Sequence, residues 1–499
     1  METVKKMSHV RKFIVLLMFV WLSSSIDVFA DELLIGIAAA DITPTLPVAL
    51  AGQFHLRIAN TIETPLTANV VALESRIGNR SVDAAIMVSC DVVGIPSEVL
   101  FALRREVKKQ LPGFDVNKIF LNAVHTHTAP VMDNGENSPF RYEVPKEGVL
   151  QVDEYNAFFV RQIADAITRA WKNRVPGSVS WGMSHAAIAY QRRTVYADGT
   201  AVMYGKTDVP EFRNMEGIEN HDINALFFWN KSGKLIALTI NIPCTAQEVE
   251  GRSAVNADYI HPVREKLKER FGPDLVILGW IGAAGDQSPR PLYRKAAEER
   301  MIKLRNLTRL EEIARRIVPA VEEIYQTVEQ DRYFDVQLIH KVEMLTLPMR
   351  IVTDMEYEIS KAEHDKAAAL ISADPKAAAQ QLARKTWNKN VVKRYENQKI
   401  NPKPTIESEI HVLRIGDIVV CTNEFELFTD YGLRIEAQSK ALQTFIIQLT
   451  GPGTYLPTEK AVRGGGYSAV VQSSVVGPDG GQILVDRTVR LINDMFQEE

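Results

Sequence analysis

The chain has 499 residues, 46% of them hydrophobic, and a formal net charge of −4 at pH 7. This length and apolar content are enough to bury a large core, and the near balance of 58 basic and 62 acidic residues gives no tract that would indicate a nucleic-acid partner. The composition therefore predicts a soluble globular enzyme or binding protein without a nucleic-acid partner.

The first 30 residues have the pattern of a secretory signal peptide. A basic start is followed by the apolar run 13–22 and by small residues that end at Ala30. This apolar run is shorter than the ~20 residues of a comfortable membrane span. We therefore expect cleavage after Ala30, no stable transmembrane anchor, and a secreted or periplasmic mature protein.

From about residue 34 to 285, apolar strand-like runs alternate with amphipathic helices. Strands are predicted at 82–90, 119–124, 178–181 and 275–281, and helices over 97–111 and 159–171. This alternation predicts an α/β fold with a mixed sheet core and flanking helices. The three cysteines, Cys90, Cys244 and Cys421, are far apart and odd in number, which argues against a disulfide framework.

The second half of the chain is different. Residues 293–329 and 357–400 are charge-rich and helical in pattern, with Pro319 and Pro375 expected as breaks, so about 293–400 is predicted to be a helical insertion. The runs 410–415 and 418–421 flank Gly416 and Asp417, a hairpin signal. We predict one catalytic domain over 31–499.

The most informative motif is His125-Thr126-His127, which follows the predicted strand 119–124. Polar residues at the carboxyl end of a buried strand lie where open α/β sheets place their ligand crevices. Residues two apart on an extended backbone share a face, so both imidazoles would reach one pocket if the strand continues through Thr126. One imidazole could then bind a metal ion while the other faces substrate.

Four separated motifs, in this order, resemble those of the neutral/alkaline ceramidase family. They are 36–44 (GIAAADITP), the His125 loop, 285–289 (GDQSP), and Asn423-Glu424-Phe425 followed by Tyr455. The resemblance spans roughly 34–496 and implies the fold of these zinc amidases, which cleave the amide bond of N-acyl sphingoid lipids. It also implies zinc ligands at His125, Glu424 and Tyr455, substrate contacts at His127 and Arg192, and at Ser288 the serine once treated as a nucleophile.

The chain departs from the family at one ligand position. The resemblance implies another zinc-binding histidine where this sequence has Thr245, and threonine is a poor zinc ligand. Cys244, Glu248, Asp258 and His261 are alternative replacements, and the sequence selects none of them. We also expect no immunoglobulin-like C-terminal domain of the kind that full-length members of this family carry.

The sequence is compatible with three functions. The first is a zinc-dependent hydrolase of an N-acyl amide, in which metal-bound hydroxide attacks the carbonyl and His127, Arg192 and Tyr455 stabilise the oxyanion. The second is a hydrolase of an acylated glycan or another carbohydrate linkage, which the polar loop 247–251 motivates. The third is a non-catalytic binder that has lost its zinc.

Overall fold

The computed structural model describes residues 32–136, 138 and 140–497, so the predicted signal peptide lies outside the described residues. Its largest element is a mixed sheet in the order β14-β13-β12-β7-β1-β4-β5-β6. Only the pairs β13·β14 and β5·β6 are parallel. These strands are β1 (Glu32–Asp41), β4 (Thr67–Ile77), β5 (Arg80–Cys90), β6 (Ile119–Ala123), β7 (Val175–His185), β12 (Asp222–Asn230), β13 (Leu235–Ile242) and β14 (Val276–Ile281).

A second sheet of four strands, in the order β16-β17-β18-β20, packs on the first. It contains β16 (Leu338–Pro348), β17 (Thr405–Ile415), β18 (Ile418–Thr422) and β20 (Gln443–Ile447). Apolar side chains from both sheets form one shared core, which includes Val71, Met87, Leu278, Leu413 and Phe445. Because the sheets bury a common face, the described chain forms a single domain.

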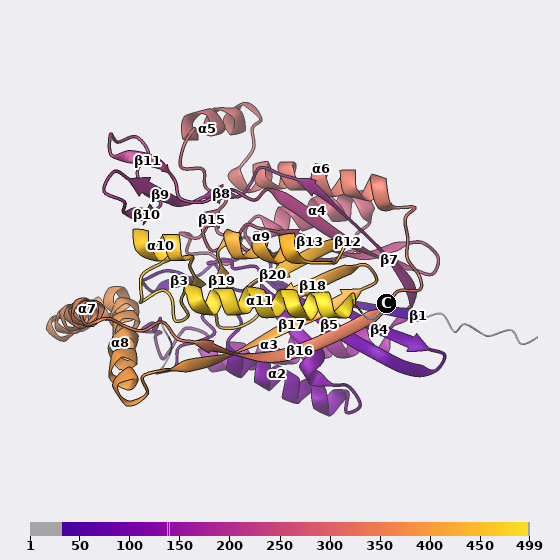
Figure 1. Cartoon of the computed structure of the whole chain (residues 1–499), viewed down its shortest axis with the longest axis horizontal. Helices are drawn as coiled ribbons and strands as arrows, with labels where there is room; N and C mark the ends of the chain where they lie inside the picture. The colour runs from indigo at the N-terminus through magenta and orange to yellow at the C-terminus, as the bar shows by residue number, and fades with distance from the viewer. Residues whose placement is uncertain (1–31, 137, 139, 498–499) are drawn as a thin grey trace, which may run out of the picture.

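Helices cover the outer faces of both sheets (Figure 1). One half of the large sheet is covered by α2 (Ser97–Gln110) and α3 (Val152–Lys172), and the other half by α4 (Ile260–Phe271) and α6 (Arg309–Val328). The small sheet is covered by α9 (Thr429–Gln438) and α11 (Pro478–Met495). The architecture is therefore helices, sheet, sheet, helices, and the predicted mixed α/β fold is confirmed.

The two edges of the large sheet approach each other. The side chains of Ser89 on β5 and Asn122 on β6 both donate hydrogen bonds to the carbonyl of Gly279 on β14, at 2.7 and 2.9 Å. The backbone after β20 closes the gap, because Gln448 N donates to Ile281 O and Ala123 N donates to Leu449 O. This closure brings the carboxyl ends of β6, β14 and β20 together.

The region predicted as a helical insertion contains α5 (Lys295–Leu304), α6, α7 (Asp354–Ala373) and α8 (Ala378–Ile400), but β16 lies within it as an edge strand of the small sheet. We expected Pro319 to break a helix, and this prediction is wrong. Pro319 lies inside α6, whose buried apolar face packs on the sheet. Pro375 does separate α7 from α8, which project together at the left of Figure 1.

Short strands surround the end of the molecule at which the sheets close. They are β2 (Val48–Leu50), β3 (Arg57–Ala59), β8 (Tyr190–Gln191), β9 (Arg193–Tyr196), β10 (Ala201–Met203), β11 (Phe212–Met215), β15 (Gln287–Ser288), β19 (Glu426–Leu427) and β21 (Tyr455–Leu456), with α10 (Glu459–Gly464) beside them.

The predicted hairpin is confirmed as β17 and β18, with Gly416 at φ 59° in its turn. All three cysteines are free and buried. Among the described residues, no helix is both long and apolar enough to cross a membrane.

Candidate active site

Polar side chains converge where the loops after β6, β13, β14 and β18 meet. Backbone hydrogen bonds join these loops: His125 N donates to Val92 O, Ala246 N to Val124 O, and Arg192 N to Asp286 O. We call the side chains that meet there, His125, His127, Arg192, Glu426 and Tyr455, the polar centre. Its position at the carboxyl ends of strands is the usual ligand site of α/β sheets.

His125 is held in an unusual backbone conformation. Its φ of 69° lies in the left-handed region, which costs a buried non-glycine residue about 1–3 kcal/mol and is commonest at functional sites. Its Nδ1 donates to the carbonyl of Val93 at 2.5 Å, so Nε2 faces Glu426 Oε2 at 3.3 Å and His127 Nε2 at 3.4 Å. The two imidazoles thus meet as expected, but because the chain turns at His125 rather than because it stays extended.

Gln247 determines which nitrogen of His127 carries a proton. The Oε1 atom of Gln247 accepts hydrogen bonds from Thr245 Oγ1 at 2.9 Å and Arg192 Nη1 at 3.2 Å. Its amide nitrogen therefore donates to His127 Nε2, at 2.7 Å. His127 Nδ1 then bears the hydrogen and faces Glu250 Oε2 at 3.3 Å. Burial raises the pKa of Glu250, but His127, Arg290 and Arg192 together outweigh burial and bring that pKa to about 2.

Arg192 supplies a fixed positive charge, and it is only 1% exposed. Its Nη2 donates to the carbonyl of Gly285 at 2.9 Å and to Tyr455 Oη at 3.2 Å, and its Nη1 donates to Tyr204 Oη at 3.3 Å. Although burial lowers the pKa of Arg192, the neighbouring Tyr455, Tyr204 and Glu426 raise it well above its usual value. The guanidinium therefore stays charged 3.8 Å from Glu426 Oε2.

Glu426, rather than Glu424, reaches His125. Glu426 lies opposite Tyr455 where β19 pairs with β21, and its Oε2 atom is buried without a well-directed hydrogen bond. The Oε1 of Glu424 instead accepts a hydrogen bond from the backbone N–H of Glu409 on β17, at 3.2 Å. The carboxylate of the polar centre is thus two residues beyond the position that the motif implied.

Ser288 lies near the centre but does not join it. Its side chain is fully buried, and its Oγ accepts a hydrogen bond from Arg290 N at 3.3 Å. Its strand β15 pairs with β8, the strand directly before Arg192. The structure therefore gives Ser288 a place in the loop that positions Arg192, and within the described residues its hydroxyl has no hydrogen bond to a basic side chain.

Thr245 and Cys244 are both fully buried. The Thr245 hydroxyl donates its hydrogen bond to Gln247 Oε1. The Cys244 thiol points to the carbonyl of Ile188 at 3.7 Å, and burial raises its pKa, so it stays a neutral thiol. Neither side chain offers an available metal-ligand atom.

The other candidate replacements also lie elsewhere. Glu248 forms an ion pair with Arg309 at 3.2 Å. Asp258 accepts a hydrogen bond from Val249 N at 2.8 Å and so holds the loop after β13. His261 is on α4 and only half-buried. In the described part of the chain, none of these three side chains forms a hydrogen bond or ion pair with the polar centre, whereas Gln247 and Glu250 both contact His127.

These residues do not match the ligand set that zinc requires. A catalytic zinc ion takes three protein ligands, commonly histidine and carboxylate, plus water. His125 Nε2 and Glu426 Oε2 have free lone pairs, but the lone pair of His127 Nε2 is taken by Gln247, and the Tyr455 hydroxyl is engaged by Arg192. Within the described part of the chain, no group of three His, Cys, Asp or Glu side chains is arranged to hold a metal ion.

Sequence reasoning missed Gln247, Glu250, Glu426 and Tyr204. Glu426 could have been suspected, because it follows Glu424 by two residues and starts the strand that pairs with Tyr455. Gln247 and Glu250 were visible only as an unusually polar loop. Tyr204 comes from the loop after β10, and nothing in the local sequence marks it.

No protein-family model matches the chain, and no curated protein matches it either. Among solved structures, neutral ceramidase from Pseudomonas aeruginosa is similar, with a TM-score of 0.64 and 18% identity, over 93% of this chain and 75% of that one. A ceramidase complexed with C2 gives a TM-score of 0.63 and 16% identity, over 92% of this chain and 75% of that chain.

The two-sheet architecture is thus a ceramidase-type α/β fold. More particularly, the chain has the fold of neutral ceramidase, and the predicted resemblance is confirmed at the level of the fold.

Proposed function

We propose that this chain is a hydrolase that cleaves an N-acyl amide at the polar centre. The observation that carries the proposal is the environment of Glu426 Oε2. This buried oxygen faces His125 Nε2 at 3.3 Å and Arg192 Nη2 at 3.8 Å and accepts no well-directed hydrogen bond. A buried polar atom without a partner is costly and calls for a functional explanation.

The arrangement can activate a water molecule for attack on the carbonyl carbon of an amide. Glu426 is placed to accept a proton from a water molecule, and the His125 ring beside it orients that water. As the water oxygen bonds to the carbonyl carbon, the C=O π electrons move onto the carbonyl oxygen. When they return, the C–N bond breaks and the proton held by Glu426 passes to the leaving amine. The negative charge on the carbonyl oxygen is stabilised by the fixed guanidinium of Arg192. Because the residues present do not match a zinc ligand set, no step is assigned to a metal.

The remaining residues of the polar centre act by positioning. The pair His127–Glu250 and the side chain of Gln247 fill one wall, and Arg57 ties this wall together by donating to the carbonyl oxygens of His127 and Glu250 at 2.6 and 2.7 Å. Gly52 packs so closely on the His127 ring that a Cβ there would lie 2.4 Å from Cγ. These contacts hold the imidazole of His127 rigidly toward the space beside His125.

A second candidate is hydrolysis of an acylated glycan or another carbohydrate linkage. The specific observation in its favour is that the polar loop 247–251 supplies side chains to the centre itself, through Gln247 and Glu250. A wall of amide and carboxylate groups suits a substrate with several hydroxyl groups.

The test is a hydrolysis screen of ceramide, N-acyl amino acids and acetylated sugars, followed by paired variants. We expect Glu426→Gln to lower kcat by about 10²–10⁴-fold, as for loss of a general base. Glu424→Gln is the matched control, two residues away, and should remain near wild type. If Glu424→Gln abolishes turnover while Glu426→Gln does not, the assignment of the carboxylate is wrong. If no amide is cleaved but an acetylated sugar is, the second candidate replaces the first.

We also propose that the mature protein acts outside the cytoplasm, as the signal-peptide pattern of residues 1–30 indicates. Edman sequencing of protein recovered from the periplasm or medium should begin at Asp31. An intact Met1 in the active fraction would contradict this.

A further inference from the structure

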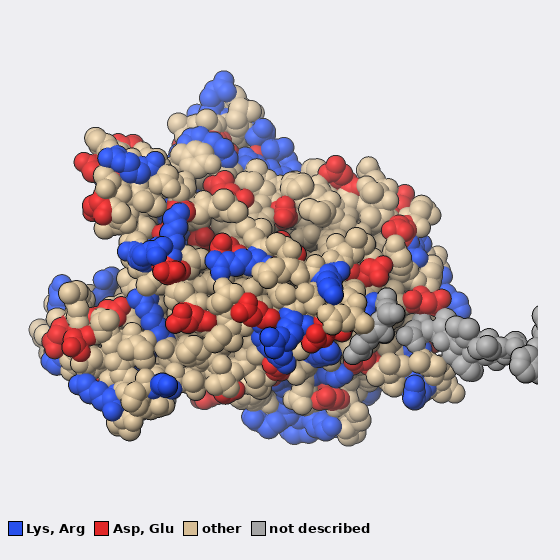
Figure 2. Space-filling view, viewed as in Figure 1, with Lys and Arg blue, Asp and Glu red and all other residues tan. Residues whose placement is uncertain are grey.

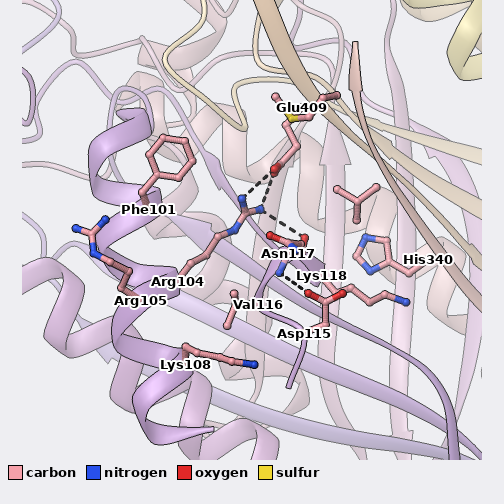
Figure 3. Close-up of a pocket in the computed structure, with 12 residues that line it drawn as sticks. Phe101, Arg104, Arg105, Lys108, Asp115, Val116, Asn117, Lys118, His340 and Glu409 are labelled. Carbon is pink, nitrogen blue, oxygen red and sulfur yellow. Dashed lines mark hydrogen bonds and ion pairs between the residues drawn. The ribbon is translucent and has the colours of Figure 1, made fainter. Parts of the chain in front are cut away.

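A groove separate from the polar centre lies between α2 and the small sheet. Its volume is about 840 Å³, and its walls come from α2, from the segment 115–118 before β6, and from β16 and β17. Figure 3 shows Phe101, Arg105 and Lys108 on the α2 side and His340 on the opposite side. No side chain of the polar centre lines the groove.

The floor of the groove is rigid and its charges are balanced. Arg104, only 6% exposed, binds both carboxylate oxygens of Glu409 at 2.6 and 2.9 Å. Glu409 also contacts His411 Nε2 at 2.9 Å, and His411 Nδ1 contacts His340 Nε2 at 2.9 Å. Because this buried chain is internally paired, it forms a preformed surface on which a ligand can lie.

Positive charge is left over on the α2 wall. Lys118 pairs with Asp83, and the Asp115 carboxylate accepts a hydrogen bond from Asn117 N at 3.1 Å. Among the described residues Arg105 and Lys108 form no ion pair, and Lys108 donates to the carbonyl of Phe114 at 3.2 Å, so these two cations outnumber the one unpaired carboxylate of the lining, Asp115. Figure 2 shows the resulting cluster of Lys and Arg at the lower edge of the molecule, where α2 lies in Figure 1.

The same groove exposes large apolar side chains. Phe101 on α2 and Met344 on β16 are each 53% exposed, and Val342 lies beside Met344 in the lining. Single exposed apolar residues are ordinary, but here two of them line one groove together with uncompensated cations. A ligand that satisfies both features carries an anionic group and an apolar chain.

We propose that this groove binds a single-chain amphiphile with an anionic head, such as an alkyl phosphate or a fatty carboxylate. The head lies against Arg105 and Lys108, and the chain lies along Phe101 and Met344. The proposal does not depend on the reaction at the polar centre, because the two sites share no residue.

Isothermal titration of the mature chain with dodecyl phosphate, below its micellar concentration, tests the proposal. We expect saturable binding, with inorganic phosphate and the uncharged dodecyl maltoside each weaker by about tenfold or more, since each lacks one of the two interactions. Arg105→Glu/Lys108→Glu should weaken dodecyl phosphate by a similar factor. Phe101→Ser/Met344→Ser should weaken dodecyl phosphate but leave the weak binding of inorganic phosphate unchanged.

Lys109→Glu is the matched control, because Lys109 lies on the same helix, pairs with Glu106 and does not line the groove. It should bind dodecyl phosphate like the wild type. Equal loss in Lys109→Glu, or undiminished binding in the Arg105/Lys108 variant, overturns the proposal. If monomeric dodecyl phosphate does not bind but the chain is retained on phosphatidylglycerol vesicles through Arg105 and Lys108, the anionic head belongs to a lipid surface and the single-chain ligand is wrong. If neither dodecyl phosphate nor the vesicles bind, the site itself is overturned.

Discussion

Gln247 offers a quantitative test of the polar centre. It is 2% exposed and hydrogen-bonds to His127, Thr245 and Arg192 at 2.7, 2.9 and 3.2 Å. Gln247→Met has nearly the same shape but no hydrogen-bonding group. The Arg192 Nη1 atom keeps its bond to Tyr204, whereas the His127 ring nitrogen and the Thr245 hydroxyl lose a partner in a buried place. Since each of these two buried polar groups left unpaired costs about 1–3 kcal/mol, the free energy of unfolding should fall by about 2–6 kcal/mol.

Urea denaturation followed by tryptophan fluorescence measures this change. Thr245→Val is the matched control, because it removes only one of the three hydrogen bonds and keeps the side-chain volume. It should cost about 1 kcal/mol. In the double variant the two effects should fall short of their sum, since both changes break the same bond. A cost for Gln247→Met no larger than that for Thr245→Val would refute the network described here.

Three further predictions follow from other parts of the structure. Hydrogen bonds from Arg315 and Arg316 lower the pKa of the buried Glu312 to about 2. These ion pairs therefore contribute stability above the unfolded pKa, and this stability is lost as pH falls toward 2. Glu312→Gln should lower the free energy of unfolding in urea by about 2–3 kcal/mol at neutral pH and by almost nothing near pH 2. Burial and the charge of Asp222 raise the pKa of Glu436 from 4.5 to about 7, so the folded state is progressively destabilised as pH rises through this interval, and the penalty is constant above it. Because Glu436 is partly exposed, Glu436→Gln should raise Tm by the equivalent of only about 1–2 kcal/mol near pH 8, and an equal gain near pH 4 would contradict the cause. A Cβ at Gly285 would lie 2.3 Å from the carbonyl oxygen of Glu426, so Gly285→Ala should displace β19 and lower kcat in the hydrolysis assay while the circular dichroism spectrum stays native; unchanged kcat would show that the position of Glu426 is not critical.

Much of the fold follows from the sequence because it depends on local apolar patterns. The run Val276–Ile281 is buried throughout, as a strand covered on both faces should be, and Gly416-Asp417 gives the hairpin between β17 and β18. The pattern could not show that residues 338–348, between two helical stretches, would form an edge strand of the small sheet. Nor could it show that Pro319 would be tolerated in α6, where packing of the apolar face outweighs the lost hydrogen bond.

The candidate site was predictable in part. His125, His127, Arg192 and Tyr455 do meet, although they come from loops far apart in the chain. Glu426 rather than Glu424 reaches the polar centre because β19 pairs with β21 and places Glu426 opposite Tyr455. The short motif around Glu424 does not specify this tertiary pairing. Gln247 acts only through three partners brought together by folding, so its sequence neighbourhood carried little signal.

The central claim is that Gln247 and Thr245 have rebuilt the centre, so that His125 and Glu426 lack a third zinc ligand. Titration of the chelator-treated mature protein with zinc, read by calorimetry and by metal analysis after dialysis, tests it most directly. We expect no tightly held zinc in the wild type and no large gain of affinity in Thr245→His, because Gln247 still occupies the lone pair of His127. Retention of close to one zinc ion per chain that is lost in both His125→Ala and Glu426→Ala would contradict this account, as would a large gain in Thr245→His.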